Sequence, residues 1–78
     1  MKNVIAYYNE INKVYVDKEE EILKKEGINI EKININTLTK AILTPSFVVL
    51  KNNRYLAKLE GKQTPGIVTS WVKSYVKE

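Results

Sequence analysis

Carboxylates, tyrosine hydroxyls and lysine amines are the side chains that could do chemistry in this chain, because the sequence contains neither cysteine nor histidine. Without a thiol there is no disulfide exchange, no thiolate nucleophile and no zinc-thiolate or iron–sulfur site. Without an imidazole the usual general base near neutral pH is missing. Redox catalysis by this chain is therefore excluded, and we expect no catalytic residue, no metal site and no cofactor.

The densest group of carboxylates is Asp17, Glu19, Glu20 and Glu21. A metal site or a catalytic carboxylate site is one interpretation of this cluster. Consecutive residues of a helix point in different directions, however, so these carboxylates cannot converge on one ligand. The alternative is that Asp17 caps a helix, Glu20 reaches back to the Asp17 amide, and the acids suit the positive end of the helix dipole. We expect this structural role.

Local patterns predict the first elements of the chain. Residues 3–9 are rich in β-prone side chains without alternation, which predicts a central strand covered on both faces. Residues 10–16 have no clear period, so we expect a loop or an irregular first helical turn. A helix follows from Asp17, with lysines near its end, and stops at Gly27 in a left-handed conformation.

The next stretch, Ile28–Asn36, alternates apolar and polar residues with a slip of one phase between Ile30 and Ile33. We expect an outer parallel strand with a bend or bulge at the slip. With the first strand and the connecting helix it makes a βαβ unit, whose crossover should be right-handed. Thr37–Leu43 is expected to form at most one or two turns of helix.

A hairpin is predicted in the second half of the chain. Thr44-Pro45 ends the short helix, because the residue before a proline is pushed into extended geometry. Phe47–Leu50 predicts a strand buried on both sides, and Asn52-Asn53 predicts a type I′ turn, since asparagine tolerates positive φ. Tyr55–Glu60 returns as the antiparallel partner. Successive residues of that partner point to opposite faces of the sheet. We expect Tyr55, Ala57 and Leu59 on one face, and Leu56, Lys58 and Glu60 on the other.

The last helix has a start signal and a continuous apolar stripe. Thr64 is the expected N-cap and Pro65 the first helical residue. The stripe follows helical spacing and consists of Ile67, Val68, Trp71, Val72, Tyr75 and Val76. We expect this helix to pack on the sheet with Trp71 in the core. Stacking of Trp71 on a ligand is the alternative.

The stretch from Thr44 to Gly61 resembles the thioredoxin and glutaredoxin signature. That signature joins a Thr/Val-Pro dipeptide with a cis peptide bond, an apolar strand followed by Lys-Asn, and a second strand that ends in glycine. Residues 30–35 resemble the family's second strand. The resemblance covers nearly the whole chain and implies an α/β fold of order β-α-β-(short α)-β-β-α, a four-stranded mixed sheet with helices packed on it. We therefore expect a single thioredoxin-like domain over residues 1–78.

The chain departs from this family at the active site. The family's Cys-x-x-Cys lies between the first strand and the first helix, and counting back from the helix places it at Lys13-Val14-Tyr15-Val16. Neither cysteine position holds Cys, and serine, the usual engineered substitute, is absent there too. The resemblance therefore implies a fold and no thiol-disulfide activity.

The function that the resemblance implies is a redox-inactive module that binds or regulates another, unidentified protein. The family's substrate groove lies between the Cys-x-x-Cys loop and the proline loop, where the backbone before the proline can pair with an extended peptide. The residues that would form this groove are Tyr8, Lys13, Val14, Tyr15, Val16, Thr44 and Pro45. Tyr8 and Tyr15 have an alternative place in the core or on the solvated surface. The sequence leaves the oligomeric state open.

The second class of function is nucleic-acid binding. Residues 1–39 hold six lysines and seven acidic residues, a net charge of −1, whereas residues 40–78 hold seven basic and two acidic residues, a net charge of +5. This asymmetry predicts a basic surface for a nucleic acid or an acidic protein, and solubility is its alternative explanation. The residues of that surface are Lys51, Arg54, Lys58, Lys62, Lys73 and Lys77.

A third class is a glutathione-binding remnant. Glutathione-transferase domains share this fold and use a hydroxyl near the end of the first strand, where this chain has Tyr7 and Tyr8.

No apolar run approaches the roughly 18 residues needed to span a bilayer, so we expect a cytoplasmic protein without a membrane partner. Size and a composition rich in Lys, Asn and Ile are typical of small thioredoxin-like proteins of AT-rich bacteria and their phages. A phage origin would place the protein in the host cytoplasm.

Overall fold

A computed structural model describes residues 2–38, 42–64 and 66–76 of the chain. The order of the elements is the expected α/β order, with a short 3-10 helix in the place of the short middle helix. The elements are β1 (Lys2–Tyr8), α1 (Lys13–Lys25), β2 (Glu31–Asn34), the 3-10 helix η1 (Ile35–Thr37), β3 (Ser46–Lys51), β4 (Arg54–Glu60) and α2 (Ile67–Val76).

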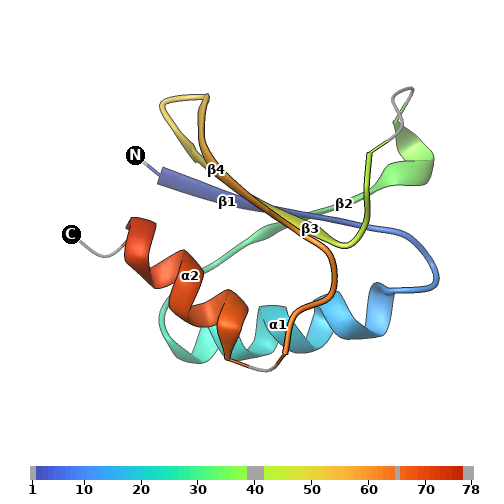
Figure 1. Ribbon diagram of the computed structural model, residues 1–78, viewed down its shortest axis with the longest axis horizontal. Coiled ribbons are helices and arrows are strands. Elements are labelled where there is room, and N and C mark those ends of the chain that lie inside the picture. Colours follow the sequence, from blue (N-terminus) through green and yellow to red (C-terminus); the bar gives the residue numbers. More distant parts are fainter. Residues whose placement is uncertain (1, 39–41, 65, 77–78) are drawn as a thin grey trace.

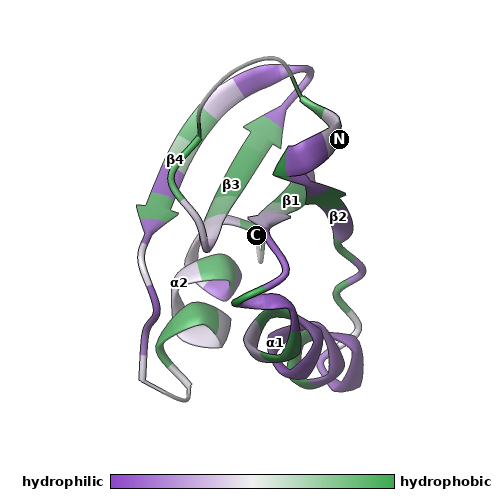
Figure 2. Ribbon diagram, turned by 90° about the vertical axis from the view of Figure 1, so that its right-hand side faces the viewer, coloured by the Kyte–Doolittle hydropathy of each residue, from purple (hydrophilic) through white to green (hydrophobic). Residues whose placement is uncertain are grey.

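The four strands form one mixed sheet in the order β2-β1-β3-β4, so the predicted mixed sheet with a central first strand is confirmed. β1 pairs parallel with β2 and antiparallel with β3, and β3 pairs antiparallel with β4. Both helices lie below the sheet on the same face, as Figure 1 and the turned view in Figure 2 show. The molecule therefore has two layers, with a covered face and an open face of the sheet.

The core lies between the covered face and the two helices. Strand residues that point to the same side supply one wall, because side chains alternate along a strand. Helix residues at i, i+3, i+4 and i+7 spacings supply the other wall. The buried apolar side chains are Val4 and Ala6 from β1, Phe47 and Val49 from β3, Val16 and Leu23 from α1, and Val68 and Val72 from α2.

The open face corrects the expectation that β1 is covered on both sides. Ile5 and Tyr7, which alternate with the core residues of β1, are only half-buried. The sequence predicted one or two turns of helix within Thr37–Leu43. The structure instead has η1 at Ile35–Thr37, and residues 39–41 lie outside the described part of the chain. In the described residues no helix lies on the open face (Figure 1).

Helix α1 begins one turn earlier than predicted, at Lys13, so Asp17 is not its N-cap. The buried positions Val16, Glu19 and Leu23 follow helical spacing, and packing of Val16 in the core draws residues 13–16 into the helix. The predicted end is confirmed, because Gly27 follows the helix with φ of +80°.

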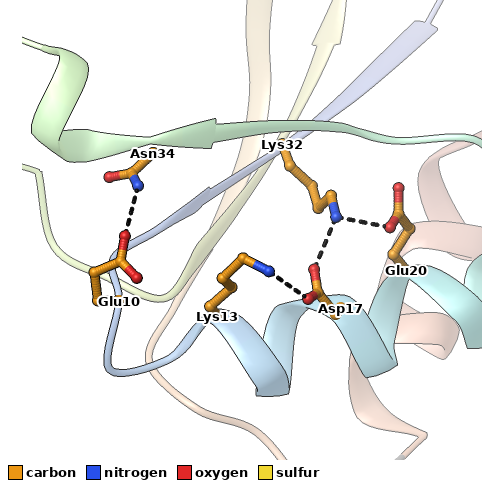
Figure 3. A network of polar contacts seen from close by, with 6 residues as sticks. All are labelled: Glu10, Lys13, Asp17, Glu20, Lys32 and Asn34. Atoms are coloured by element: carbon orange, nitrogen blue, oxygen red, sulfur yellow. Dashed lines mark hydrogen bonds and ion pairs between the residues drawn. The ribbon is translucent and has the colours of Figure 1, made fainter.

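Asp17 takes part in ion pairs instead of a capping box, as Figure 3 shows. Its carboxylate accepts from Lys32 Nζ of β2 at 2.8 Å and from Lys13 Nζ at 3.2 Å, while Glu20 binds the same Lys32 at 3.0 Å. The hydrogen bond from Lys32 is the main cause that lowers the pKa of Asp17, and the two carboxylates raise the pKa of Lys32. Asn34 of β2 donates to Glu10 at 3.3 Å, so polar contacts attach the β2 edge to α1 and the loop before it.

The strands after α1 differ in detail from the prediction. β2 is limited to Glu31–Asn34, because the chain leaves the sheet into η1. The predicted type I′ turn agrees with positive φ values of 52° at Asn52 and 67° at Asn53. A register shift between Val49 and Leu50 pairs Leu50 with Tyr55. This bulge moves Tyr55 to the open face, so its expected place beside Ala57 and Leu59 is wrong.

Helix α2 begins at Ile67, whose amide donates to the carbonyl of Thr64 at 3.2 Å. The expected role of Pro65 falls outside the described residues. Trp71 is half-buried and packs edge-on against Tyr75 with ring centroids 5.4 Å apart. It therefore borders the core, whose fully buried α2 residues are Val68 and Val72.

Candidate functional site

A groove of about 500 Å³ lies where three segments meet at one end of the molecule. The first turn of α1 and the loop before it form one wall, the proline loop forms the floor, and the loop between β4 and α2 adds a rim. The lining residues are Ile11, Asn12, Val14, Tyr15, Lys18, Thr44, Pro45 and Lys62.

Asn9 fixes the position of the first wall. Its side-chain Oδ1 accepts from the backbone amides of Ile11 at 2.9 Å and Asn12 at 3.1 Å. Its backbone amide donates to Asn12 Oδ1 at 2.8 Å. Its Nδ2 donates to Thr44 Oγ1 at 3.0 Å. One side chain therefore shapes the loop before α1 and attaches it to the proline loop.

The proline loop itself is attached to the end of β4. The Thr44–Pro45 peptide bond is cis, and the Pro45 carbonyl accepts from the amide of Gly61 at 2.8 Å. Gly61 has φ of +88°, a conformation that favours glycine, so the glycine at this position is required by the backbone path.

Tyr15 joins the α1 wall to the rim. Its hydroxyl accepts from the Gln63 amide at 2.9 Å, and its ring packs edge-on against Phe47 with centroids 6.5 Å apart. Lys62 Nζ lies 5.7 Å from the centre of the same ring, within the range of a cation–π contact. Burial is the main cause that raises the pKa of Tyr15, and the charge of Glu19 adds to it, so the phenol stays protonated at neutral pH.

The surface of the groove is apolar and basic. Ile11 is 93% exposed and Val14 is 67% exposed, which is unusual for aliphatic side chains beside a groove. Lys18 and Lys62 line it from opposite walls. An arrangement of this kind can hold an apolar side chain between two cations.

Most of the predicted groove residues come together here. Val14, Tyr15, Thr44 and Pro45 all line the groove. Lys13 lies next to it and is exposed, paired with Asp17.

Two predicted groove residues are elsewhere. Val16 is fully buried in the core, because it occupies the inward face of α1, so it cannot touch a ligand. Tyr8 is partly buried and packs against the core, which agrees with its alternative place.

Sequence reasoning missed Asn9, Asn12 and Ile11. Their roles depend on a contact between residues 9 and 44, and no local pattern in the sequence marks such a long-range pair. The signal that could have found the loop is the pair of asparagines three residues apart, which favours reciprocal side chain to backbone hydrogen bonds.

The predicted basic residues are spread over separate elements. Lys51 and Arg54 face each other at the end of the hairpin, and Lys58 pairs with Glu60 at 3.1 Å. Lys62 lines the groove, and Lys73 of α2 pairs with Glu26 at 2.6 Å. Lys77 lies outside the described residues.

The carboxylates of the acidic cluster of α1 point to different surroundings. Asp17 and Glu20 bind Lys32, whereas Glu19 points into the protein and is only 3% exposed. The expectation that these acids serve capping and solvation is therefore wrong for Asp17 and Glu19. Within the described residues, no group of three or more acidic side chains is placed to bind a metal ion.

Glu19 is the most unusual titratable group near the site. Its Oε2 has no hydrogen-bond partner among the described residues, and burial raises the pKa of its carboxyl. It lies one turn after Tyr15 on the same helix, and its charge acts on that phenol.

Comparison with solved structures identifies the fold. The chain is 16% identical to thioredoxin 1 from Thermosipho africanus over 94% of this chain and 92% of that one, with a TM-score of 0.72. Thioredoxin f2 from Chlamydomonas reinhardtii gives 14% identity, coverage of 99% and 81%, and a TM-score of 0.76. A thioredoxin variant from Halobacterium salinarum is 11% identical over 99% of this chain and 76% of that one, with a TM-score of 0.70.

This protein therefore has a thioredoxin-like fold, as the resemblance in its sequence implied. No family model and no curated protein matches the sequence. The chain is a thioredoxin-like domain without cysteine, so thiol-disulfide exchange of the thioredoxin type is impossible for it. In the described residues no helix is long and apolar enough to cross a membrane.

Proposed function

We propose that this chain is a redox-inactive, thioredoxin-like binding module, and that its groove holds an extended segment of another protein. The observation that carries the proposal is that the chain has an ordered groove although it lacks the cysteines of a redox-active site. The groove of about 500 Å³ is attached on both sides, through Asn9 to Thr44 and through Tyr15 to Gln63, although no cysteine needs positioning.

The chemistry of the groove favours a particular ligand. Exposed Ile11 and Val14 lose contact with water when an apolar side chain covers them, and each buried CH₂ contributes about 0.8 kcal/mol. Lys18 and Lys62 attract carboxylates on either side of that apolar residue. We therefore infer an extended peptide in which one or two apolar residues are flanked by Asp or Glu, paired along the backbone before Pro45.

A peptide array read by binding of the labelled protein tests this inference. We expect selection of apolar residues next to acidic ones, with affinity that falls as salt increases because the lysines are exposed. In an NMR titration with a selected peptide, the largest shifts should be at residues 9–15, 44–46 and 61–63. Selection of basic peptides, or shifts confined to the hairpin, would contradict the proposal.

Variants of the groove sharpen the test. Val14→Asp should abolish binding and leave the fold intact, because this side chain is 67% exposed. Leu56→Asp is the matched control, since Leu56 is 45% exposed and lies on β4, outside the groove. If both variants capture the same peptides as the wild type, the groove is not the binding site.

Nucleic-acid binding and glutathione binding stay predictions of lower rank. The described basic residues are divided between the hairpin, the groove and α2, and two of them are ion-paired. Neither Tyr7 nor Tyr8 lines the groove. A gel-shift assay at low salt and a glutathione titration followed by NMR test these functions directly.

A further inference from the structure

Two polar side chains that line the groove have their oxygen atoms occupied by backbone amides. The side-chain Oδ1 of Asn12 accepts from the amide of Asn9 at 2.8 Å. The hydroxyl oxygen of Tyr15 accepts from the amide of Gln63 at 2.9 Å. Because a backbone N–H can only donate, these contacts fix both oxygens as acceptors. The side-chain Nδ2 of Asn12 and the hydroxyl hydrogen of Tyr15 are the groups that stay available as donors.

Asn9 gives Thr44 the same polarity. The Asn9 Oδ1 accepts from the backbone amides of Ile11 and Asn12, and this fixes the orientation of the side-chain amide. The atom that faces Thr44 is therefore Nδ2, a donor, which lies 3.0 Å from Thr44 Oγ1. A hydroxyl has one hydrogen, so the hydrogen of Thr44 must point away from the amide that donates to its oxygen.

Every polar side chain that lines the groove in the described residues thus offers hydrogen-bond donors. The hydroxyl hydrogen of Thr44 has no acceptor among the described residues, and the same holds for the free donors of Asn12 and Tyr15. Lys18 and Lys62 carry donors only and form no ion pair within the described part of the chain. A ligand in this groove therefore meets donors and positive charge.

We propose that the groove holds a carboxylate of its ligand, which accepts a hydrogen bond from the Thr44 hydroxyl and is neutralised by Lys18 and Lys62. An ionised carboxylate fits because its oxygens only accept, whereas the NH₂ group of a side-chain amide would face further donors. The inference rests on the proposed function, and it identifies the bound group as an Asp or Glu side chain of the extended segment. Asn9 is a positioning residue, because it acts through Thr44.

A phosphate group also only accepts hydrogen bonds, but the surroundings favour a carboxylate. Phosphate is typically bound by the planar fork of arginine, and no arginine lines the groove in the described residues. The neighbouring side chains Ile11 and Val14 are 93% and 67% exposed. An alkyl chain that carries the carboxylate can cover them, and this burial is favourable.

Isovalerate tests the site, because it joins a carboxylate to the isobutyl group of a leucine side chain. Isovaleramide is its matched neutral control. In NMR titrations at constant ionic strength, we expect isovalerate to bind in the millimolar range, with the largest shifts at the side-chain amide of Asn12 and at residues 44–46 and 62–63. Isovaleramide should bind about tenfold more weakly. Equal affinity for the two probes, or no shift with isovalerate, would overturn the proposal. Tighter binding of inorganic phosphate would also overturn it.

Thr44→Val separates the hydrogen bond from the charge, because it keeps the shape of the side chain and both lysines. We expect this variant to bind isovalerate about tenfold more weakly and to change the binding of isovaleramide much less. Thr44→Ser should bind isovalerate like the wild type, and circular dichroism should show both variants folded. If Thr44→Val weakens both probes equally, Thr44 acts only on the shape of the groove and the proposal is overturned.

Asn9→Asp tests the positioning role, because a carboxylate at residue 9 can accept the Thr44 hydrogen and turn it away from the ligand. This variant should weaken isovalerate binding, whereas Asn53→Asp, which makes the same charge change in the exposed hairpin turn, should not. In the Thr44→Val background, Asn9→Asp should have a smaller effect, since no hydrogen remains to be turned. Fully additive losses would overturn the positioning role of Asn9.

The peptide array separates failure of this inference from failure of the proposed function. If isovalerate binds as expected and the array selects no peptide, the carboxylate site stands and the binding of an extended segment is contradicted. If the array selects peptides with equal preference for Asp and Asn, the groove binds peptides and the carboxylate site is overturned.

Discussion

The two faces of the sheet differ in what covers them, although they share the same four strands. On the covered face, helices α1 and α2 bury Phe47 and Val49 completely. On the open face, Ile5 and Leu50 from the same strands are half-buried, while Ser46 and Val48 of β3 are buried. The difference shows that one helical layer is enough to define the fold of the described residues.

The largest expected effect is the loss of stability when a side chain of the covered face is truncated. Phe47→Ala should lower the free energy of unfolding by about 3–5 kcal/mol, because it removes the largest fully buried side chain. Ile5→Ala on the open face should cost about 1 kcal/mol, since part of its surface already contacts water. Urea denaturation of dilute protein measures both. Equal losses would mean that the open face is covered in solution.

Local sequence signals predicted the features that depend on a few neighbouring residues. Gly27 and the Asn52-Asn53 turn have the positive φ values that were expected from their residue types. The parallel pairing of β2 followed from the long connection that carries α1, the central place of β1 followed from its lack of alternation, and the four-stranded mixed sheet followed from the family resemblance. The groove residues Val14, Tyr15, Thr44 and Pro45 followed from the family resemblance, because that resemblance places the two loops together.

Features that depend on tertiary packing could not be predicted in the same way. The start of α1 was placed late because Asp17 carries a strong capping signal, while burial of Val16 outweighs the weak helix propensity of its turn. The bulge that moves Tyr55 has no local marker such as glycine. The contact of Asn9 with Thr44 joins residues 35 positions apart, and pairing over that distance leaves no periodic pattern.

Glu19 is a polar residue within the covered, apolar side. Glu19→Gln should stabilise the protein by about 1–2 kcal/mol at pH 7, because a buried carboxylate whose Oε2 has no partner among the described residues is costlier than a neutral amide. Its pKa is raised above 4.5 in the folded state, so the folded state binds the proton more tightly than the unfolded state. The stability of the wild type should therefore fall as pH rises from 4.5 through the raised pKa.

Thermal or urea denaturation between pH 4 and pH 8 measures this effect. The advantage of Glu19→Gln should disappear below pH 4.5, where the wild-type carboxyl is protonated in both states. Asp17 contributes to the pH dependence of stability with the opposite sign, because its pKa is lowered in the folded state. Its stabilising contribution is present at higher pH and is lost as pH falls through 3.8 and below. A constant difference between wild type and variant across the whole range would contradict a raised pKa of the buried Glu19 carboxyl.

Tyr15→Phe tests the place where the covered side meets the groove. It keeps the ring against Phe47 and removes the hydroxyl that accepts from the Gln63 amide, so we expect a loss of about 1 kcal/mol. Hydrogen exchange should become faster at Gln63 and its neighbours, because the rim loses its attachment to α1. Unchanged exchange at residues 61–64 would show that Gly61 alone holds this loop.

The smallest expected effect concerns the outer edge of the sheet, where Lys32 attaches β2 to α1. Asp17→Ala and Lys32→Ala should each cost at most about 0.5–1 kcal/mol, because these ion pairs are exposed to solvent. If Asp17 acts through Lys32, the double variant should cost less than the sum of the single ones, and the coupling should shrink in high salt. An N-cap would give a loss that is independent of Lys32. Additive losses in a double-mutant cycle would show that Asp17 acts independently of Lys32, and coupled losses would confirm that this carboxylate connects α1 to β2.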